Sequence, residues 1–147
     1  MKVSTKGRYG LRAMLDLAVH AEQGHVALNA IAERQEISMN YLEQVFSTLR
    51  KAGLVKSVKG AQGGYMMSMP PSQMTVGMIL RALEGKLAVV DETEYTTVAE
   101  SVQYCIQTMV WDVMTDTVNK MVDQTTLEDL VNEYRNLSGK ESSVYYI

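Results

Sequence analysis

The chain has 147 residues, and 46% of them are hydrophobic, enough for one domain with an additional element or for two small domains. It contains no run of about 18 apolar residues, so we expect no membrane span. The first residues lack the apolar segment of a secretory signal, and a single cysteine, Cys105, excludes an internal disulfide bond. These features predict a protein of the reducing cytoplasm.

The net charge of −3 argues against a nucleic-acid-binding protein until its distribution is considered. Residues 1–60 hold nine Lys and Arg against five Asp and Glu, a net of +4, whereas residues 61–147 hold five against twelve, a net of −7. This asymmetry indicates a basic working face in the first part of the chain and a different role for the second. Because small domains often differ by a few charges, charge alone does not decide the matter.

Three helices are predicted before residue 54. The first begins at Ser4 or Thr5 and ends near Gln23. A short strand is predicted over residues 25–28, and a brief helix over residues 30–35 follows it, capped by Asn29.

The third predicted helix begins after Ser38, its expected cap, and ends near Ala52, where Gly53 has the place of a C-terminal glycine. Its apolar face is predicted to pack into the core and consists of Leu42, Val45, Phe46 and Leu49.

A hairpin with a basic, glycine-rich tip is predicted next. Residues 54–58 and 65–69 form its strands and residues 59–64 its turn. Two prolines end the second strand, and Thr75 is expected to cap a fourth helix that runs to about Leu83.

An acidic linker separates this unit from one long helical pattern over residues 99–123. The apolar positions of that pattern are Val102, Ile106, Met109, Val110, Val113, Val118, Met121 and Val122. A helix outside the compact unit has too little of its own domain to cover these side chains, so we expect it to pair with a second subunit. Residues 125–128 predict a capping box for a final helix that ends near Arg135.

The brief helix, the tight turn at Glu36 and Ile37, and the Ser38-capped helix make a helix-turn-helix, whose second helix enters the major groove of DNA. Short polar side chains on its outer face suit contacts with base edges. The predicted base contacts are Ser38, Asn40, Glu43, Gln44 and Ser47, and Tyr41 is predicted to reach a phosphate through its hydroxyl group.

The hairpin tip is predicted to carry Lys59 to the DNA backbone or minor groove, where glycines let backbone amides approach phosphates. The predicted contacts at the tip are Lys59, Gly60, Gln62 and Gly63, and further phosphate contacts are predicted for Lys2, Lys6 and Arg8. The alternative interpretation is a solvated polar helix face followed by an ordinary hairpin.

Other chemistries have weaker support. The glycines of residues 60–64 lack the Gly-Lys-Ser/Thr ending of a nucleotide-binding loop. Cys105 is interpreted as a core residue, with a redox-sensing thiol as the alternative. The eleven methionines are interpreted as core residues, and no His, Cys or acidic residues form a metal-ligand set, so we predict neither a metal nor a cofactor.

Residues 4–16, 37–44, 49–55 and 60–65 resemble the Rrf2 family of bacterial winged-helix regulators, and the resemblance returns at residues 125–130. It implies a homodimer held by the long helix, with two wings on a palindromic operator. One branch of the family binds an iron–sulfur cluster through three cysteines and a histidine. Here only Cys105 remains, and Thr108 stands at the place of the histidine, so the resemblance implies no cluster.

A second, cluster-free branch represses cysteine-metabolism genes and works with cysteine synthase. This chain resembles it in residues 83–85 and in its ending, Tyr145, Tyr146 and Ile147. The resemblance implies a partner-binding tail, whose terminal carboxylate would mimic an amino-acid substrate. The alternative is a disordered end whose aromatic residues pack on the dimer or have no role.

We therefore predict a mainly α-helical fold: a winged helix-turn-helix with a small antiparallel β wing over residues 1–85, an acidic linker over 86–98, dimerisation helices over 99–135 and a tail over 136–147. The expected protein is no enzyme but a homodimeric repressor that binds double-stranded DNA, without a membrane partner. Two alternatives stay open: a redox or iron–sulfur-type sensor of the same family, and an interaction protein that regulates cysteine synthase through its tail.

Overall fold

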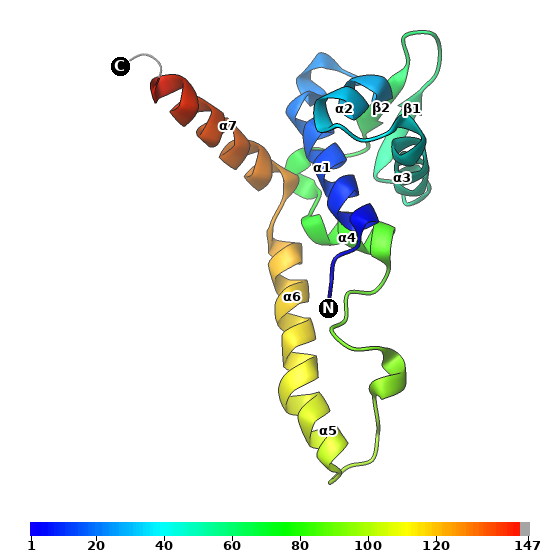
Figure 1. The fold of residues 1–147 in the computed structure, drawn as a ribbon, viewed down its shortest axis with the longest axis vertical. Helices are drawn as coiled ribbons and strands as arrows, with labels where there is room; N and C mark the ends of the chain where they lie inside the picture. Colours follow the sequence, from blue (N-terminus) through cyan, green and yellow to red (C-terminus); the bar gives the residue numbers. More distant parts are fainter. Residues whose placement is uncertain (145–147) are drawn as a thin grey trace.

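The computed structural model describes residues 1–144, the side chains of residues 23 and 140–144 excepted. Residues 1–85 form a mainly helical unit with one two-stranded sheet, from which a long helical arm projects (Figure 1). The elements of this unit are α1 (Thr5–Val19), the 3-10 turn η1 (Ala21–Gln23), α2 (Leu28–Gln35), α3 (Met39–Lys51), β1 (Val55–Val58), β2 (Gly64–Met67), η2 (Pro71–Gln73) and α4 (Val76–Glu84).

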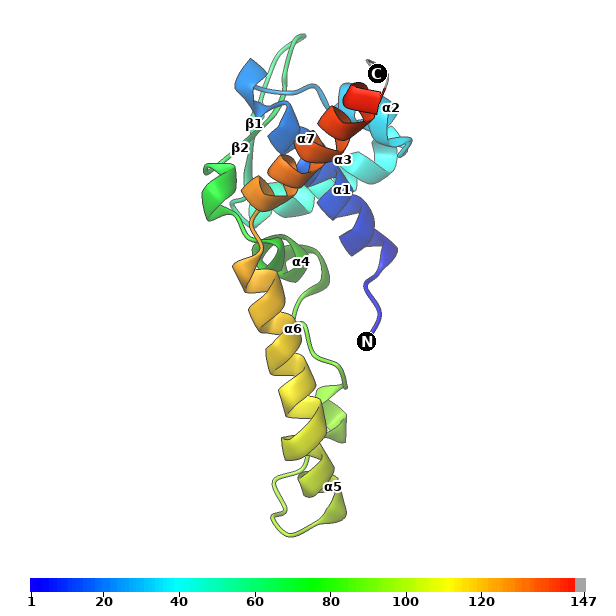
Figure 2. The same ribbon diagram turned by 90° about the vertical axis from the view of Figure 1, so that its left-hand side faces the viewer.

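The arm is one continuous helical stretch that consists of α5 (Val102–Ile106), the π-helical turn η4 (Gln107–Trp111) and α6 (Asp112–Gln124). The linker, with the short turn η3 (Glu92–Glu94), runs beside the arm from α4 to the free end at α5 in both views (Figures 1 and 2). Hydrogen bonds fasten it there: the amide of Val89 donates to Thr115, and Asn119 donates to the carbonyl of Leu87. The last helix, α7 (Leu127–Val144), turns back across α1.

One hydrophobic core unites α1, α2, α3, α4 and the start of α7. The apolar face predicted for α3 is buried completely, since Leu42, Phe46 and Leu49 have no exposed surface and Val45 is 1% exposed. Leu127 of α7 is equally buried. Burial of such side chains stabilises the fold by about 1.5–3 kcal/mol each, so α7 is an integral part of the first unit.

Two glycines of α1 permit its close packing on α4. A Cβ at Gly10 would lie 2.1 Å from Cδ1 of Leu83, and one at Gly7 would lie 2.3 Å from Oε1 of Glu84. A larger residue at Gly10 would displace the buried Leu83 side chain, and one at Gly7 would displace the end of the Glu84 side chain, so α1 keeps glycine here although it is a poor helix former.

The predicted caps of α1, α3 and α4 are confirmed: Ser4, Ser38 and Thr75 each accept a hydrogen bond from a first-turn amide. The hairpin is confirmed as well, with β1 and β2 antiparallel and Val55 opposite Met67. Gly53 has a φ of 80°, the left-handed conformation that ends α3.

Several boundaries were predicted wrongly. Residues 25–28 form no strand of their own; Val26 makes a single bridge to Tyr65, and α2 starts at Leu28 after Ala27 instead of after Asn29. The first helix stops at Val19, and the turn η1 completes the stretch to Gln23.

The final helix was also misjudged. Its capping pair is Thr126 and Asp129, one residue later than predicted. The helix continues to Val144 and so includes most of the segment predicted as a tail. The helix of the arm begins at Val102 rather than at 99, just after Glu100, whose φ is 70°.

The arm leaves a row of apolar side chains uncovered. Val102 is 77% exposed, Met109 71%, Val113 54% and Met121 57%. Of the predicted apolar positions only Val122, near the base of the arm, is buried. Among residues 1–144 no helix is long and apolar enough to cross a membrane.

Candidate nucleic-acid interface

The first turn of α3 is fixed by its own cap and by α1. The hydroxyl group of Ser38 accepts a hydrogen bond from the amide of Tyr41 at 3.2 Å, and the Tyr41 ring meets the edge of Tyr9 with 5.9 Å between centroids. The Ser38 hydroxyl thus serves as a helix cap, a role that was predicted beside its DNA contact.

The outer face of α3 carries the polar side chains predicted to contact bases. Asn40, Glu43 and Gln44 are exposed, whereas Ser47 and Tyr41 are half-buried. The polar residues other than Tyr41 occupy the side opposite the buried Leu42 and Phe46, whereas Tyr41 packs against the core. Because the core holds the helix, this face points outward with a fixed orientation, as a helix that enters a major groove requires.

The wing lies against α3 through an aromatic contact and continues into a glycine-rich tip. Phe46 of α3 and Tyr65 of β2 have ring centroids 4.9 Å apart. At the tip, a Cβ on Gly63 would lie 2.1 Å from the carbonyl oxygen of Val58, and Gly60 has a φ of 115°. Both glycines are therefore required for the turn that presents Lys59.

An open groove of about 960 Å³ separates the wing from the start of α3. Its predicted site residues are Glu43, Lys59, Gly60, Gln62 and Gly63. From α3 the groove is lined by Met39 and Glu43, whereas the predicted base contacts Asn40, Gln44 and Ser47 are not part of its lining. A polar helix face beside a basic tip is a surface on which bases and phosphates can be contacted together.

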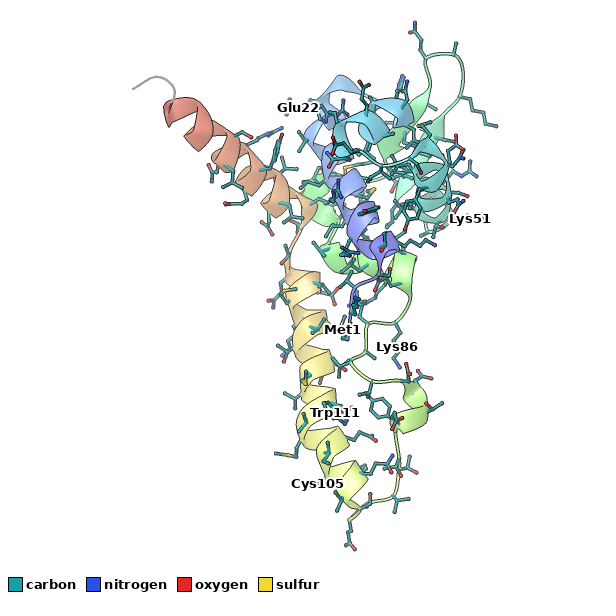
Figure 3. The ribbon with its side chains drawn as sticks, viewed as in Figure 1. Met1, Glu22, Lys51, Lys86, Cys105 and Trp111 are labelled. Carbon is teal, nitrogen blue, oxygen red and sulfur yellow. The ribbon has the colours of Figure 1, made fainter. Side chains whose placement is uncertain are left out.

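The cations at the N-terminus lie outside this groove. Lys2 lines a separate hollow with Glu84 and Lys86, and Figure 3 shows the neighbouring Met1 close to Lys86 and away from the wing. Arg8 donates to the Thr5 hydroxyl at 3.1 Å, and Lys6 is half-buried. The structure therefore does not gather these three predicted phosphate contacts with the main set.

Sequence reasoning missed two residues that brace the interface. Arg12 donates to the backbone carbonyl of Gln35 at 2.5 Å, directly before the turn into α3, and its guanidinium lies 5.0 Å from the centroid of the Tyr9 ring. His25 contacts the carbonyl oxygen of Gln62 at the wing tip, with its Nε2 at 2.5 Å. Only the spacing of Tyr9 and Arg12, one turn apart on α1, was visible in the sequence.

Cys105 lies near the free end of the arm, remote from the wing (Figure 3). Its side chain is exposed, so the prediction of a core cysteine is wrong for this chain. No group of three or more His, Cys, Asp or Glu side chains within the described part of the chain is arranged to hold a metal ion.

With this geometry established, comparison with known proteins identifies the family. The model of the Rrf2 family, an "iron-dependent transcriptional regulator", matches residues 3–133. The chain belongs to the Rrf2 family. It is accordingly a transcriptional regulator and not an enzyme.

Two named groups of Rrf2 regulators are similar to it. The regulator CymR of Bacillus subtilis is 42% identical over 147 residues, which span both chains completely. The solved structure of that protein, the global cysteine regulator, superposes with a TM-score of 0.78 and 41% identity over 90% of this chain and 98% of that one. IscR of T. potens superposes with a TM-score of 0.73 and 44% identity over 91% and 88%.

The iron named in the family description finds no matching ligand set in this Rrf2 regulator. A cluster typically needs four ligands. Cys105 is the single cysteine of the chain, and the described residues gather no three suitable side chains around it or elsewhere. The residues present therefore do not fit an iron–sulfur cluster held by thiolates.

Proposed function

We propose that this protein is a cytoplasmic repressor that reads a palindromic DNA operator as a homodimer, without an iron–sulfur cluster, and controls genes of cysteine or sulfur metabolism. The exposed polar face of α3 and the cationic wing tip support DNA recognition, because one rigid unit holds both beside an open groove. The similarity to CymR, named as a cysteine regulator, supports the choice of target genes.

In this mechanism Asn40, Glu43 and Gln44 contact base edges in the major groove. Lys59 follows the phosphate backbone into the neighbouring minor groove, and the amides at Gly60 and Gly63 approach phosphates. Repression follows when the bound dimer occupies a promoter.

Selection of bound duplexes from a random pool tests this function and identifies the operator at the same time. We expect a two-fold symmetric consensus whose half-sites are separated by a multiple of one helical turn, as two recognition helices require. A pool that shows no enrichment, or an asymmetric single site, would contradict the proposal.

The C-terminal residues Tyr145, Tyr146 and Ile147 lie outside the described residues, and we propose them as a docking tail for cysteine synthase. The proposal rests on the similarity to CymR, which extends over all 147 residues, and on the two aromatic side chains that this segment offers to a partner. Titration of the synthase with the full chain and with a chain lacking Ile147 tests it. The shortened chain should lose binding, and equal affinities would refute the tail.

A second candidate signal is oxidation of Cys105, which the exposure of that thiol favours. Reversible loss of operator binding after peroxide treatment, absent in Cys105→Ser, would establish it. The same loss in Cys105→Ser would show that another group is responsible.

A further inference from the structure

A cavity of about 440 Å³ lies behind the helix-turn-helix, between α1, α2 and the middle of α7. Leu15 and Val19 of α1 give it an apolar wall, and Tyr134 of α7 also lines it. Its volume is that of a site for a small organic molecule. The candidate DNA-contacting residues are absent from its lining.

The polar side of this cavity holds the Asp16 carboxylate, whose oxygens already accept hydrogen bonds from neighbouring side chains. Oδ1 of Asp16 accepts from Arg34 at 2.7 Å, and Oδ2 accepts from Gln35 at 2.9 Å. The ring of His20 adds a further contact at 3.4 Å. With these donors around it, the Asp16 carboxylate, 2% exposed, has no need of a cationic ligand.

Arg12 is the cation of the cavity without a charged partner. Within the described part of the chain its guanidinium meets a neutral carbonyl, that of Gln35, and the face of the Tyr9 ring, but no carboxylate. A guanidinium has five N–H donors in a planar fork that matches a carboxylate. The cavity thus offers a positive group above an apolar floor.

We propose that this cavity binds a small organic carboxylate with an apolar body. Its carboxylate pairs with Arg12, and its body lies between the Leu15–Val19 wall and Tyr134. A carboxylate carries a negative charge and accepts two parallel N–H bonds from a guanidinium, whereas the Gln35 carbonyl is neutral and accepts one bond from Arg12. The carboxylate therefore outcompetes the Gln35 carbonyl for the guanidinium.

Withdrawal of Arg12 from Gln35 affects the helix-turn-helix directly. Gln35 is the last residue of α2, and the next residue, Glu36, has a left-handed φ of 56° in the turn that leads to α3. The hydrogen bond from Arg12 holds this turn against α1. Loss of that bond loosens the recognition helix, so the ligand lowers DNA affinity; this regulatory step rests on the proposed function.

Binding is tested first without DNA, with benzoate as the probe and neutral benzamide as its control. NMR spectra of the full-length ¹⁵N-labelled protein should show saturable shifts at the Arg12 Nε–H and the amides around Leu15 with millimolar benzoate. Benzamide should bind about tenfold more weakly or not at all, because it lacks the charge that Arg12 recognises.

Two variants and a matched control locate the site. Arg12→Gln and Tyr134→Ala should each weaken benzoate binding about tenfold, and Arg12→Lys should restore part of it. Arg135→Gln removes an exposed arginine of α7 that lies outside the cavity, so it should bind as the unaltered protein does. Absence of saturable shifts, equal binding of benzamide, or equal losses in Arg12→Gln and Arg135→Gln would overturn the proposal.

The regulatory step is tested with a duplex enriched from the random pool. Benzoate should lower operator affinity in the unaltered protein and in Arg135→Gln, but not in Arg12→Gln, and by reciprocity DNA should weaken benzoate binding. Benzoate binding that leaves DNA affinity unchanged would refute the coupling alone. A protein that binds benzoate but no duplex would refute the proposed function and leave the cavity assignment intact.

Discussion

Asp16 of α1 is a buried charge whose hydrogen-bond donors Arg34 and Gln35 belong to α2. Its carboxylate is 2% exposed and takes two hydrogen bonds from Arg34 and one from Gln35 within 3.0 Å. The hydrogen bonds between Arg34 and Asp16, and then the charge of Asp16, raise the pKa of Arg34. This ion pair holds α2 against α1 and thereby helps to fix the position of α3, which follows α2 in the chain.

We predict that Arg34→Met destabilises the fold by about 3 kcal/mol, because it leaves a buried carboxylate without its charged partner. The guanidinium is 37% exposed, so water enters and the loss falls at the lower end of the range for buried pairs. Urea denaturation measures it.

The double variant Asp16→Asn/Arg34→Met serves as the control. It should regain part of the lost stability, since no unpaired charge remains. If the double variant is less stable than Arg34→Met by the whole loss of unfolding free energy measured for Asp16→Asn alone, the two residues act independently.

At the scale of elements, a bidentate ion pair joins the unit of residues 1–85 to the arm. Arg81 of α4 donates to both carboxylate oxygens of Asp123 in α6, at 2.6 and 2.8 Å, and to Asn119 at 2.7 Å. The hydrogen bonds from Arg81 and then its charge lower the pKa of Asp123 below the ordinary value of 3.8.

A lowered carboxyl pKa gives this junction a pH dependence of known sign. The stabilisation is fully present above 3.8 and is lost as the pH falls through the lower pKa of the folded state. We predict that Asp123→Asn lowers the thermal midpoint at neutral pH, and that the difference from the unaltered protein vanishes in acid.

Asp116→Asn, on the exposed side of the same helix, is the matched control, since no ion pair to Asp116 is found among the described residues. Its midpoint should follow that of the unaltered protein at every pH. A difference for Asp123→Asn that persists unchanged in acid would contradict the role of the Arg81 pair.

The elements that the sequence predicts well are those with local signals. Ser38 and Gly53 bracket α3, and the alternation after Gly53 marks β1, because caps and periodicity act over a few residues. The prediction of a short strand at residues 25–28 was wrong. Val26 forms a single β-bridge, and its partner Tyr65 lies far away in the sequence. Polar residues from Asn136 onward hid a helix that begins with the buried Leu127.

The same difference between local signals and long-range contacts applies to the candidate site. Glu43 and Lys59 were predictable from the helix-turn-helix and the basic turn, and the structure brings both to one groove. The braces at Arg12 and His25 were missed, because each acts on a backbone carbonyl more than twenty residues away, and no spacing in the sequence encodes such a contact.

For the whole molecule, the uncovered face of the arm is the feature that a single chain does not explain. Val102, Met109, Val113 and Met121 lie exposed along it. Exposed apolar faces of this extent mark interaction surfaces in proteins. We propose that a second copy of the chain covers this apolar face of the arm, in agreement with the homodimer predicted from the sequence.

We predict that Val113→Glu converts a dimer into a monomer, because a charge would lie in the apolar interface. Light scattering after size-exclusion chromatography measures the mass. Val98→Glu places the same charge on a valine of the linker that is 63% exposed, and it should leave the dimer intact. A monomeric unaltered protein, or a dimer in Val113→Glu, would contradict the proposed interface.

In the proposed function the exposed face of α3 and the wing tip together read DNA, and salt-dependent binding tests this most directly. Affinities for a selected operator and a scrambled duplex would be measured over a range of salt concentrations for the unaltered protein, Lys59→Ala and Gln44→Ala. Lys59→Ala should weaken binding to both duplexes and reduce the salt slope by about 1.8, because each dimer loses two phosphate contacts worth about 0.9 each. Gln44→Ala should keep the slope and reduce the preference for the operator. Unchanged affinity, slope and preference in both variants would contradict the claim.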